Sequence, residues 1–179
     1  MPSNWDKAKR YIWRKTTNVS HGTTTFFDHL WSVYDILKDD MKQDEYLCRA
    51  GLFHSIYGTA HFKNFKDDSL SREQVKKWIG EKAENLVYEF CKTKKRTKSI
   101  FLRTGDWSDD VYKDLVILEI ANLRHIYSSR MEHGIKSKSF AKENQKRMND
   151  YRTKLHYLYI VWCLLINNEM IDELNQSVG

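Results

Sequence analysis

Proline is nearly absent from this chain. Its 179 residues include 1 proline, at position 2, and only 7 glycines. A β-sandwich or β-barrel needs many turns and normally contains more of both residues. Hydrophobic residues make up 41% of the sequence, and aromatic residues 13%, which is enough for a core and excludes wholesale disorder. The sequence therefore predicts an all-α protein.

Apolar residues recur at three- and four-residue steps along five long segments, as on one face of a helix. These segments cover about 25–41, 44–55, 72–93, 109–131 and 141–167, and a short helix is expected near 5–14. Loops are expected at about 56–70, 94–107 and 132–140. Nothing repeats internally and no shift in composition marks a boundary. We expect one domain over residues 1–179, a bundle of about five to seven helices with a core at about 20–130 and a long C-terminal helix at about 141–170.

The charge balance is mildly basic. The 30 Lys and Arg residues exceed the 24 Asp and Glu residues, a net charge of +6. Such an excess fits a small anion, a nucleic acid or no specific partner. The basic stretch at 92–103 is more typical of a solvated loop than of a phosphate site. No base-stacking pattern, helix-turn-helix, P-loop or dinucleotide fingerprint is present, so nucleic acid is not an expected partner.

Targeting and redox signals are equally sparse. No apolar run reaches the roughly 18 residues of a membrane span, and the first residues lack the apolar segment of a secretory signal. Cys48, Cys91 and Cys163 are far apart and lie within apolar helical patterns. We interpret them as reduced core residues of a cytoplasmic protein, and the absence of a Cys-x-x-Cys pair argues against a thiolate zinc site.

Four of the seven histidines lie in the first third of the chain, at His21, His29, His54 and His61. A single histidine on an apolar helix face is more often a hydrogen-bonded core residue than a ligand. His29 and His54, however, lie on consecutive predicted helices and near helix ends. That placement favours a shared metal ion.

Asn122 lies on the apolar stripe of the fourth long segment, where a polar side chain is costly unless it is hydrogen-bonded. It is either a structural amide or part of a ligand sphere. His125, one turn later, is a further candidate on the same side.

These elements together resemble the HD-domain superfamily of helical metallohydrolases. In that family a histidine near the start of one helix precedes a His-Asp pair ending the next, and a later helix supplies a final aspartate. Here Asp-His29-Leu-Trp-Ser-Val resembles the first element, Ala-Gly-Leu-Phe-His54-Ser55-Ile-Tyr-Gly the second, and Leu-Glu-Ile-Ala-Asn122-Leu the third. The likeness covers about residues 20–130, and the string His-Ser-Ile-Tyr-Gly-Thr resembles a divergent bacterial branch.

Both family aspartates are replaced, by Ser55 and Asn122. Neutral side chains are weaker ligands for a divalent metal than carboxylates are. The resemblance implies His29 and His54 as metal ligands, with His21 or His61 recruited as further ligands or as proton shuttles. We expect the small polar residues to contact substrate.

Residues after the His-Ser pair are further candidates for substrate binding. Tyr57 and Thr59 flank Gly58, which would let the backbone approach a ligand closely, although a helix C-cap is the slightly favoured interpretation. Ser55 as a nucleophile beside His54 lacks any supporting Gly-x-Ser-x-Gly elbow.

The resemblance implies metal-dependent hydrolysis of a phosphate ester or nucleotide-like small anion, with a divalent metal of unspecified identity. One alternative is a non-catalytic ligand- or partner-binding module with a degenerate site. A further alternative is an HD-fold iron oxygenase, against which the missing carboxylates argue.

Overall fold

Helices account for almost all of the regular structure in the computed structural model, which describes residues 2–22, 24–58, 70–136 and 138–178. Within these residues there are eight α-helices, one short π-helix and one hairpin of two-residue strands. The prediction of an all-α bundle is confirmed. The helices exceed the expected five to seven because one predicted segment is divided and one predicted loop is partly helical.

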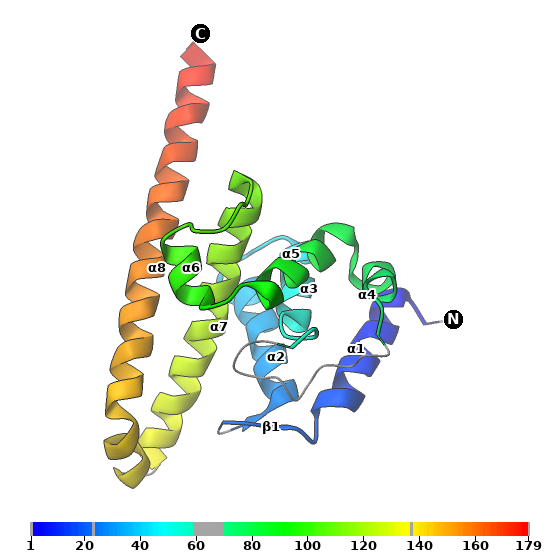
Figure 1. The fold of residues 1–179 in the computed structure, drawn as a ribbon, viewed down its shortest axis with the longest axis vertical. Coiled ribbons are helices and arrows are strands. Elements are labelled where there is room, and N and C mark those ends of the chain that lie inside the picture. The colour runs from blue at the N-terminus through cyan, green and yellow to red at the C-terminus, as the bar shows by residue number, and fades with distance from the viewer. Residues whose placement is uncertain (1, 23, 59–69, 137, 179) are drawn as a thin grey trace.

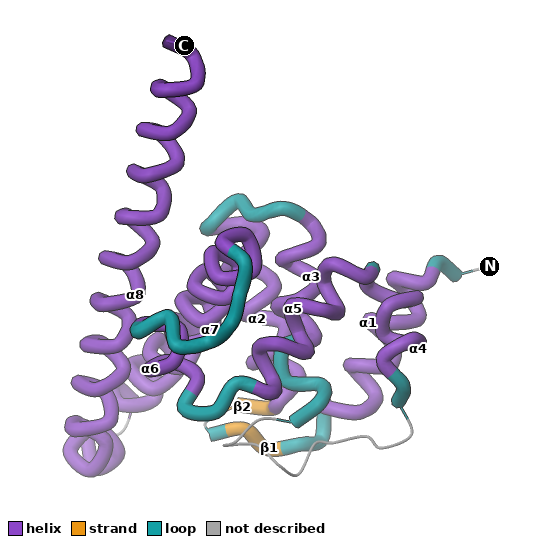
Figure 2. The backbone as a smooth tube through the Cα atoms, turned by 45° about the horizontal axis from the view of Figure 1, so that its top comes forward, coloured by secondary structure: helices purple, strands orange, loops and turns teal. Residues whose placement is uncertain are grey.

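The N-terminal half contains three helices and a small hairpin. Helix α1 (Asn4–Thr16) is followed by antiparallel strands β1 (Ser20–His21) and β2 (Thr24–Thr25), which lie beside the start of helix α2 (Phe26–Asp35) (Figure 2). A π-helical turn, η1 (Ile36–Asp40), extends α2, and helix α3 (Glu45–Phe53) follows. Helices α2 and α3 pack against each other.

The third predicted segment is two helices, α4 (Arg72–Ile79) and α5 (Glu81–Lys92). Gly80 separates them with φ 92°, a backbone conformation that side chains other than glycine rarely adopt. Helix α6 (Arg96–Phe101) lies within the predicted loop at 94–107. The prediction of an entirely irregular basic loop is therefore wrong.

Two long helices complete the chain. Helix α7 (Asp109–Lys136) and helix α8 (Lys138–Val178) run antiparallel and side by side (Figure 1). Helix α7 ends and helix α8 begins inside the predicted loop at 132–140, so the described residues of that predicted loop are helical and the prediction of a loop there is wrong. Helix α8 extends well past the other elements at its C-terminal end (Figure 1).

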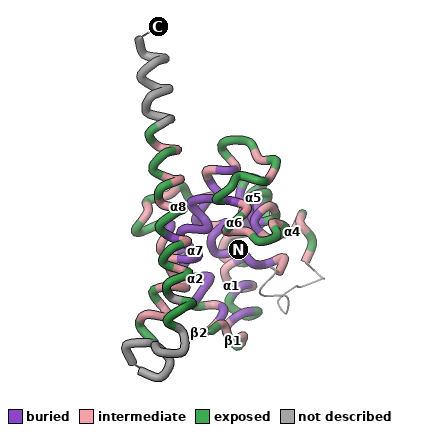
Figure 3. Tube along the Cα trace, turned by 60° about the vertical axis from the view of Figure 1, so that its left-hand side comes forward, coloured by how far each residue is buried: buried purple, intermediate pink, exposed green. Residues whose placement is uncertain are grey.

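The core lies where α2, α3, α5 and α7 meet, and its residues are buried there while the outward side of α8 is largely exposed (Figure 3). The largest fully buried side chains include Phe26, Phe53, Phe90, Leu30 and Leu115. Each lies within one of the segments predicted to be helical. Eight buried polar residues interrupt this core within the described part of the chain, among them His29, His54, Glu119 and Asn122.

The cysteines are free, but they do not share one environment. Cys48 is buried, whereas Cys163 is exposed on α8, so its prediction as a core residue is wrong. The stripe of α8 that faces α7 does not include position 163. None of the described helices is long and apolar enough to cross a bilayer.

Candidate functional site

His29 and His54 are brought together by the ends of two helices. His29 lies in the first turns of α2, which a reciprocal capping box between Thr25 and Asp28 begins. His54 is the C-cap of α3, and its backbone carbonyl accepts a bond from the Cys91 thiol at 3.2 Å. Because both helix ends are held by local hydrogen bonds, both imidazoles have defined positions.

The Nε2 atoms of the two rings face each other at 3.1 Å. On the far side of His54, Nδ1 lies 2.7 Å from the Gly51 carbonyl oxygen. A carbonyl can only accept, so Nδ1 carries the proton and the Nε2 of neutral His54 presents a lone pair. On the far side of His29, Nδ1 lies 2.8 Å from Nδ1 of His125.

In the absence of a metal, one set of tautomers satisfies all three contacts. His125 Nδ1–H donates to His29 Nδ1, His29 Nε2–H donates to His54 Nε2, and His54 Nδ1–H donates to Gly51. All three rings are then neutral. The chain of bonds runs from α7 through α2 to α3 and ties these helices together.

Burial keeps these rings uncharged. It lowers the pKa of His54 to about 3, with the positive charge of Arg96 adding to the effect. Burial likewise lowers the pKa of His125 to about 4 and, together with its histidine neighbours, holds the pKa of His29 well below its usual value of 6.5. Near neutral pH, all three have lone pairs available.

His21 adds a fourth ring from the hairpin. Its ring stacks on that of His29, with centroids 4.3 Å apart. Burial, followed by the charge of Arg130, lowers the pKa of His21 from 6.5. The end of β1 thus places an imidazole with a lowered pKa against the ring of His29.

Asn122 projects from α7 and its amide donates to Glu119 at 3.0 Å. Glu119 is almost fully buried and also accepts from Arg96 at 2.8 Å and from Thr97 at 2.5 Å. The Glu119 carboxylate is therefore neutralised by α6, and the orientation of the Asn122 amide is set by that carboxylate.

These side chains line one cavity of about 670 Å³. Its wall includes His21, His29, His54, Ser55 and Asn122. Its other side is formed by α7 and α8, and carries Arg130, Arg147, Asp150, Tyr151 and Lys154. Together with Arg96, the basic side chains outnumber the acidic ones along the wall, so the cavity favours an anion.

The structure places the predicted site residues in three groups. His21, His29, His54, Ser55 and Asn122 share the cavity. Thr59 and His61 lie outside the described residues. Tyr57 does not line the cavity, contrary to the expectation of a substrate contact.

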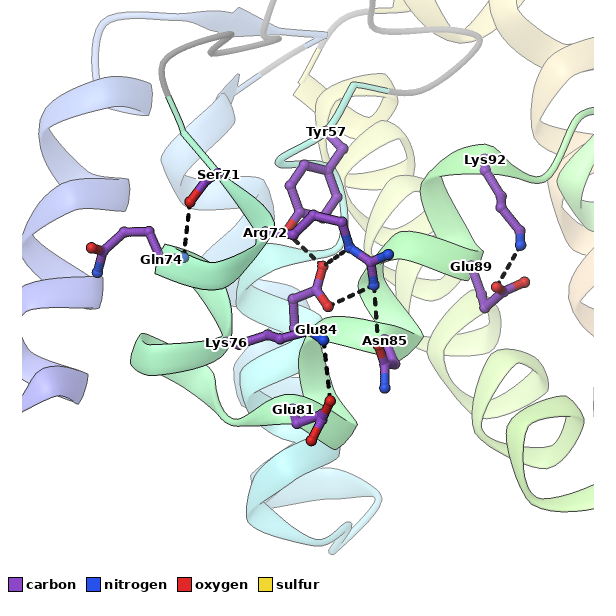
Figure 4. A network of polar contacts seen from close by, with 10 residues as sticks. All are labelled: Tyr57, Ser71, Arg72, Gln74, Lys76, Glu81, Glu84, Asn85, Glu89 and Lys92. Carbon is purple, nitrogen blue, oxygen red and sulfur yellow. Dashed lines mark hydrogen bonds and ion pairs between the residues drawn. The ribbon is translucent and has the colours of Figure 1, made fainter.

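Tyr57 instead belongs to a buried ion-pair network (Figure 4). Its hydroxyl donates to Glu84 at 2.8 Å, and Arg72 binds both oxygens of the same carboxylate at 2.6 and 2.8 Å. Glu84 is fully buried, so its charge requires these donors. The hydrogen bond to Glu84 directs the Tyr57 hydroxyl toward α5, and Tyr57 does not contribute to the cavity wall.

Sequence reasoning missed the basic wall and Glu119. Arg96 was assigned to a solvated loop, yet its side chain is only 15% exposed because it pairs with buried Glu119. A signal was present, since Glu119 lies on the same apolar stripe as Asn122, one turn earlier. Arg147 and Lys154 gave no such signal, because only the packing of α8 on α7 brings them to the cavity.

The histidine pair fits a metal ion as two neighbouring ligands. Two ring nitrogens bound to one tetrahedral zinc at about 2.0–2.1 Å lie about 3.3 Å apart, close to the observed 3.1 Å. Each ring also has a hydrogen-bonding partner on its opposite nitrogen, as metal-bound histidines usually do. Among the described residues, however, no three His, Cys, Asp or Glu side chains are grouped to hold a metal.

Comparison with known families gives one match. A family model described as a domain of unknown function (DUF6817) matches residues 13–95. The match spans helices α2 to α5 and contains His21, His29 and His54, whereas Asn122 lies beyond it. No curated protein and no solved structure matches the chain.

Proposed function

We propose that this protein is a divergent HD-like hydrolase that binds a divalent metal ion and acts on a phosphate ester or nucleotide-like small anion. One observation carries the proposal: the Nε2 atoms of His29 and His54 converge at 3.1 Å on the wall of a basic cavity. The order of these residues along the chain matches the family pattern described above.

His29 and His54 are the residues that would hold the metal. A bound divalent ion would polarise a phosphoryl oxygen and acidify a water molecule. In that state His29 Nδ1–H donates to His125, which reverses the direction of the bond in the metal-free protein. His125 thereby orients the ring of His29 and needs no direct contact with substrate.

The remaining polar residues have separate roles in this proposal. Arg130, Arg147 and Lys154 supply positive charge to hold the anion. His21 is mostly neutral near pH 7, so it can accept a proton from water within the cavity. Ser55 and Asn122 offer neutral hydrogen-bonding groups beside the histidines.

A non-catalytic binding module is the second candidate. It is favoured by the charge state of the cavity wall, since Glu119 is neutralised by Arg96 and Asn122 is bonded to Glu119. The Glu119 carboxylate is then not free to serve as a general base. Such a module would bind a metal or an anion in the same cavity without turnover.

Two measurements separate these candidates. Protein treated with chelator is titrated calorimetrically with Zn²⁺, Mn²⁺ and Fe²⁺, and the loaded protein is assayed with p-nitrophenyl phosphate, bis-p-nitrophenyl phosphate and a panel of nucleotides. His54→Ala is compared with His156→Ala, which alters an exposed histidine on α8. The hydrolase proposal expects metal binding and turnover that His54→Ala abolishes and His156→Ala retains.

Metal binding without turnover on any substrate would favour the binding module. Absence of metal binding by the wild-type protein would reject the histidine pair as a metal site. If His54→Ala and His156→Ala lost metal binding and turnover equally, His54 would be rejected as a metal ligand.

A further inference from the structure

The exposed large apolar residues of this protein are concentrated on one surface. Within the described residues they are Trp13, Tyr88, Phe101, Leu102, Tyr157, Ile160 and Leu164. Four of these seven lie on α6 and α8, Leu102 directly follows α6, and the rings of Phe101 and Tyr157 are 5.2 Å apart. A contiguous apolar surface of this kind usually marks an interaction site.

This surface is distinct from the face of α8 that packs on α7. Leu155 and Leu158 are buried in the body, whereas Tyr157, Ile160 and Leu164 are 48%, 44% and 57% exposed. Helix α8 is therefore apolar on two sides in this region. One side packs on α7, and on the other side the ring of Tyr157 contacts Phe101 of α6, whereas Ile160 and Leu164 remain largely exposed.

The spacing of the exposed residues Tyr157, Ile160 and Leu164 continues along the sequence as a heptad pattern. Steps of three and four residues connect Tyr157, Ile160, Leu164, Asn167, Ile171, Leu174 and Val178 in the sequence, and α8 is helical throughout this range. A pattern of alternating three- and four-residue steps over three heptads is the signature of a coiled-coil seam. We call these seven positions the α8 seam.

We propose that the α8 seam pairs with the same seam of a second copy of this chain, forming a homodimer. The positions that flank the seam, Val161, Cys163, Asn168, Met170, Asn175 and Ser177, carry no charge. Identical chains are not repelled by such flanks, and nothing in them selects an oppositely charged partner.

Asn167 is a further reason to expect that the partner of the α8 seam is an identical chain. It is the polar exception in the seam and lies near its middle. A polar amide in a coiled-coil core costs stability unless it meets another amide, and an identical chain in a twofold arrangement supplies one. A partner with an entirely apolar seam would leave this amide unpaired.

The length of α8 is the third argument. Its C-terminal part extends beyond every other helix of the fold (Figure 1). Isolated helical segments shorter than about 12–15 residues are marginally stable in water without tertiary contacts. Pairing with a second α8 supplies those contacts along the extension.

Sedimentation equilibrium of the full-length protein over a hundredfold range of concentration tests the proposal. Wild type is expected to be a dimer. Leu164→Asp places a charge in the seam and should weaken dimerisation at least about a hundredfold, because two buried leucines are lost and two like charges face each other. Arg152→Asp introduces the same residue at an exposed position off the seam and should leave the dimer intact.

Asn167→Leu is expected to strengthen the dimer, so this second test does not use a destabilised variant. It should tighten the dimer about tenfold or more, because a polar core position becomes apolar. Circular dichroism of each variant confirms that helix content is retained. A monomeric wild type, or a Leu164→Asp protein that dimerises as tightly as wild type, overturns the proposal.

Discussion

The Nε2 atoms of His29 and His54 lie 3.1 Å apart, although 25 positions of sequence separate the residues. Each ring is held from behind, His29 by His125 and His54 by the Gly51 carbonyl. The facing nitrogens are therefore fixed by contacts to three helices. This arrangement leads to several expected outcomes.

Loss of the histidine behind His29 should weaken metal binding without removing a ligand. His125→Phe deletes the Nδ1 contact at 2.8 Å while keeping an aromatic ring of similar shape. We expect metal affinity to fall about 10–100-fold, the usual effect of losing such a supporting bond. Calorimetric titration of His125→Phe and of the exposed-site control His156→Ala measures it. Equal affinity in His125→Phe and wild type would contradict the supporting role.

Restoring a carboxylate at position 55 should strengthen the site. Ser55 lines the cavity directly after His54, so Ser55→Asp places an anionic oxygen beside the histidine pair. Metal affinity is expected to rise at least about tenfold. A titration in which Ser55→Asp binds no more tightly than wild type would show that the cavity geometry is not that of the family.

Restoring the carboxylate at position 122 should behave differently. The Asn122 amide donates to Glu119 at 3.0 Å, so Asn122→Asp replaces a hydrogen bond with two facing acceptors. The metal-free variant should be less stable by about 1–3 kcal/mol. Saturating metal should recover part of this loss. Urea unfolding with and without metal measures both effects. If the urea midpoint of Asn122→Asp in chelator equalled that of wild type, the hydrogen bond between Asn122 and Glu119 would not contribute to stability.

The metal-free protein should lose stability as the pH falls below about 6.5. Unfolded histidines have a pKa near 6.5, whereas burial lowers the pKa to about 4 in His125 and to about 3 in His54. Between these values the unfolded state binds protons that the folded state does not, so acid favours unfolding. Each such histidine contributes up to about 1.4 kcal/mol per pH unit.

Urea unfolding in chelator between about pH 7 and pH 4.5 tests this dependence. His125→Phe should reduce the slope, and His156→Ala should leave it unchanged. A free energy of unfolding that is constant over this range would mean that the rings are not held neutral by burial.

Removing Arg72 should destabilise the fold strongly. Arg72→Met leaves the fully buried Glu84 carboxylate without its bidentate partner. Breaking a buried pair in this way costs about 3–5 kcal/mol. Lys76→Met breaks the exposed pair with Glu81 and should cost less than about 1 kcal/mol. Thermal unfolding of the two variants compares them, and equal losses would contradict the burial argument.

The sequence alone predicted the helical class and most helix positions, because apolar periodicity and capping residues are local properties of the chain. The predicted segments at 72–93 and 109–131 begin where α4 and α7 begin, and apolar residues of the predicted segments form the core. The sequence also identified His29, His54 and Asn122 as candidate site residues, because each is a polar residue within an apolar helical pattern. A buried polar group requires a hydrogen-bonding partner, wherever in the chain that partner lies.

Tertiary structure decided what those partners are. Arg96, Arg147 and Lys154 reach the cavity only because α6 and α8 pack beside α7, and no local pattern encodes that packing. The hydrogen bond between Tyr57 and Glu84 likewise depends on the packing of segments that are distant in the sequence. Periodicity specifies which face of a helix is buried, whereas the neighbour that the face meets is set by the packing of the whole chain.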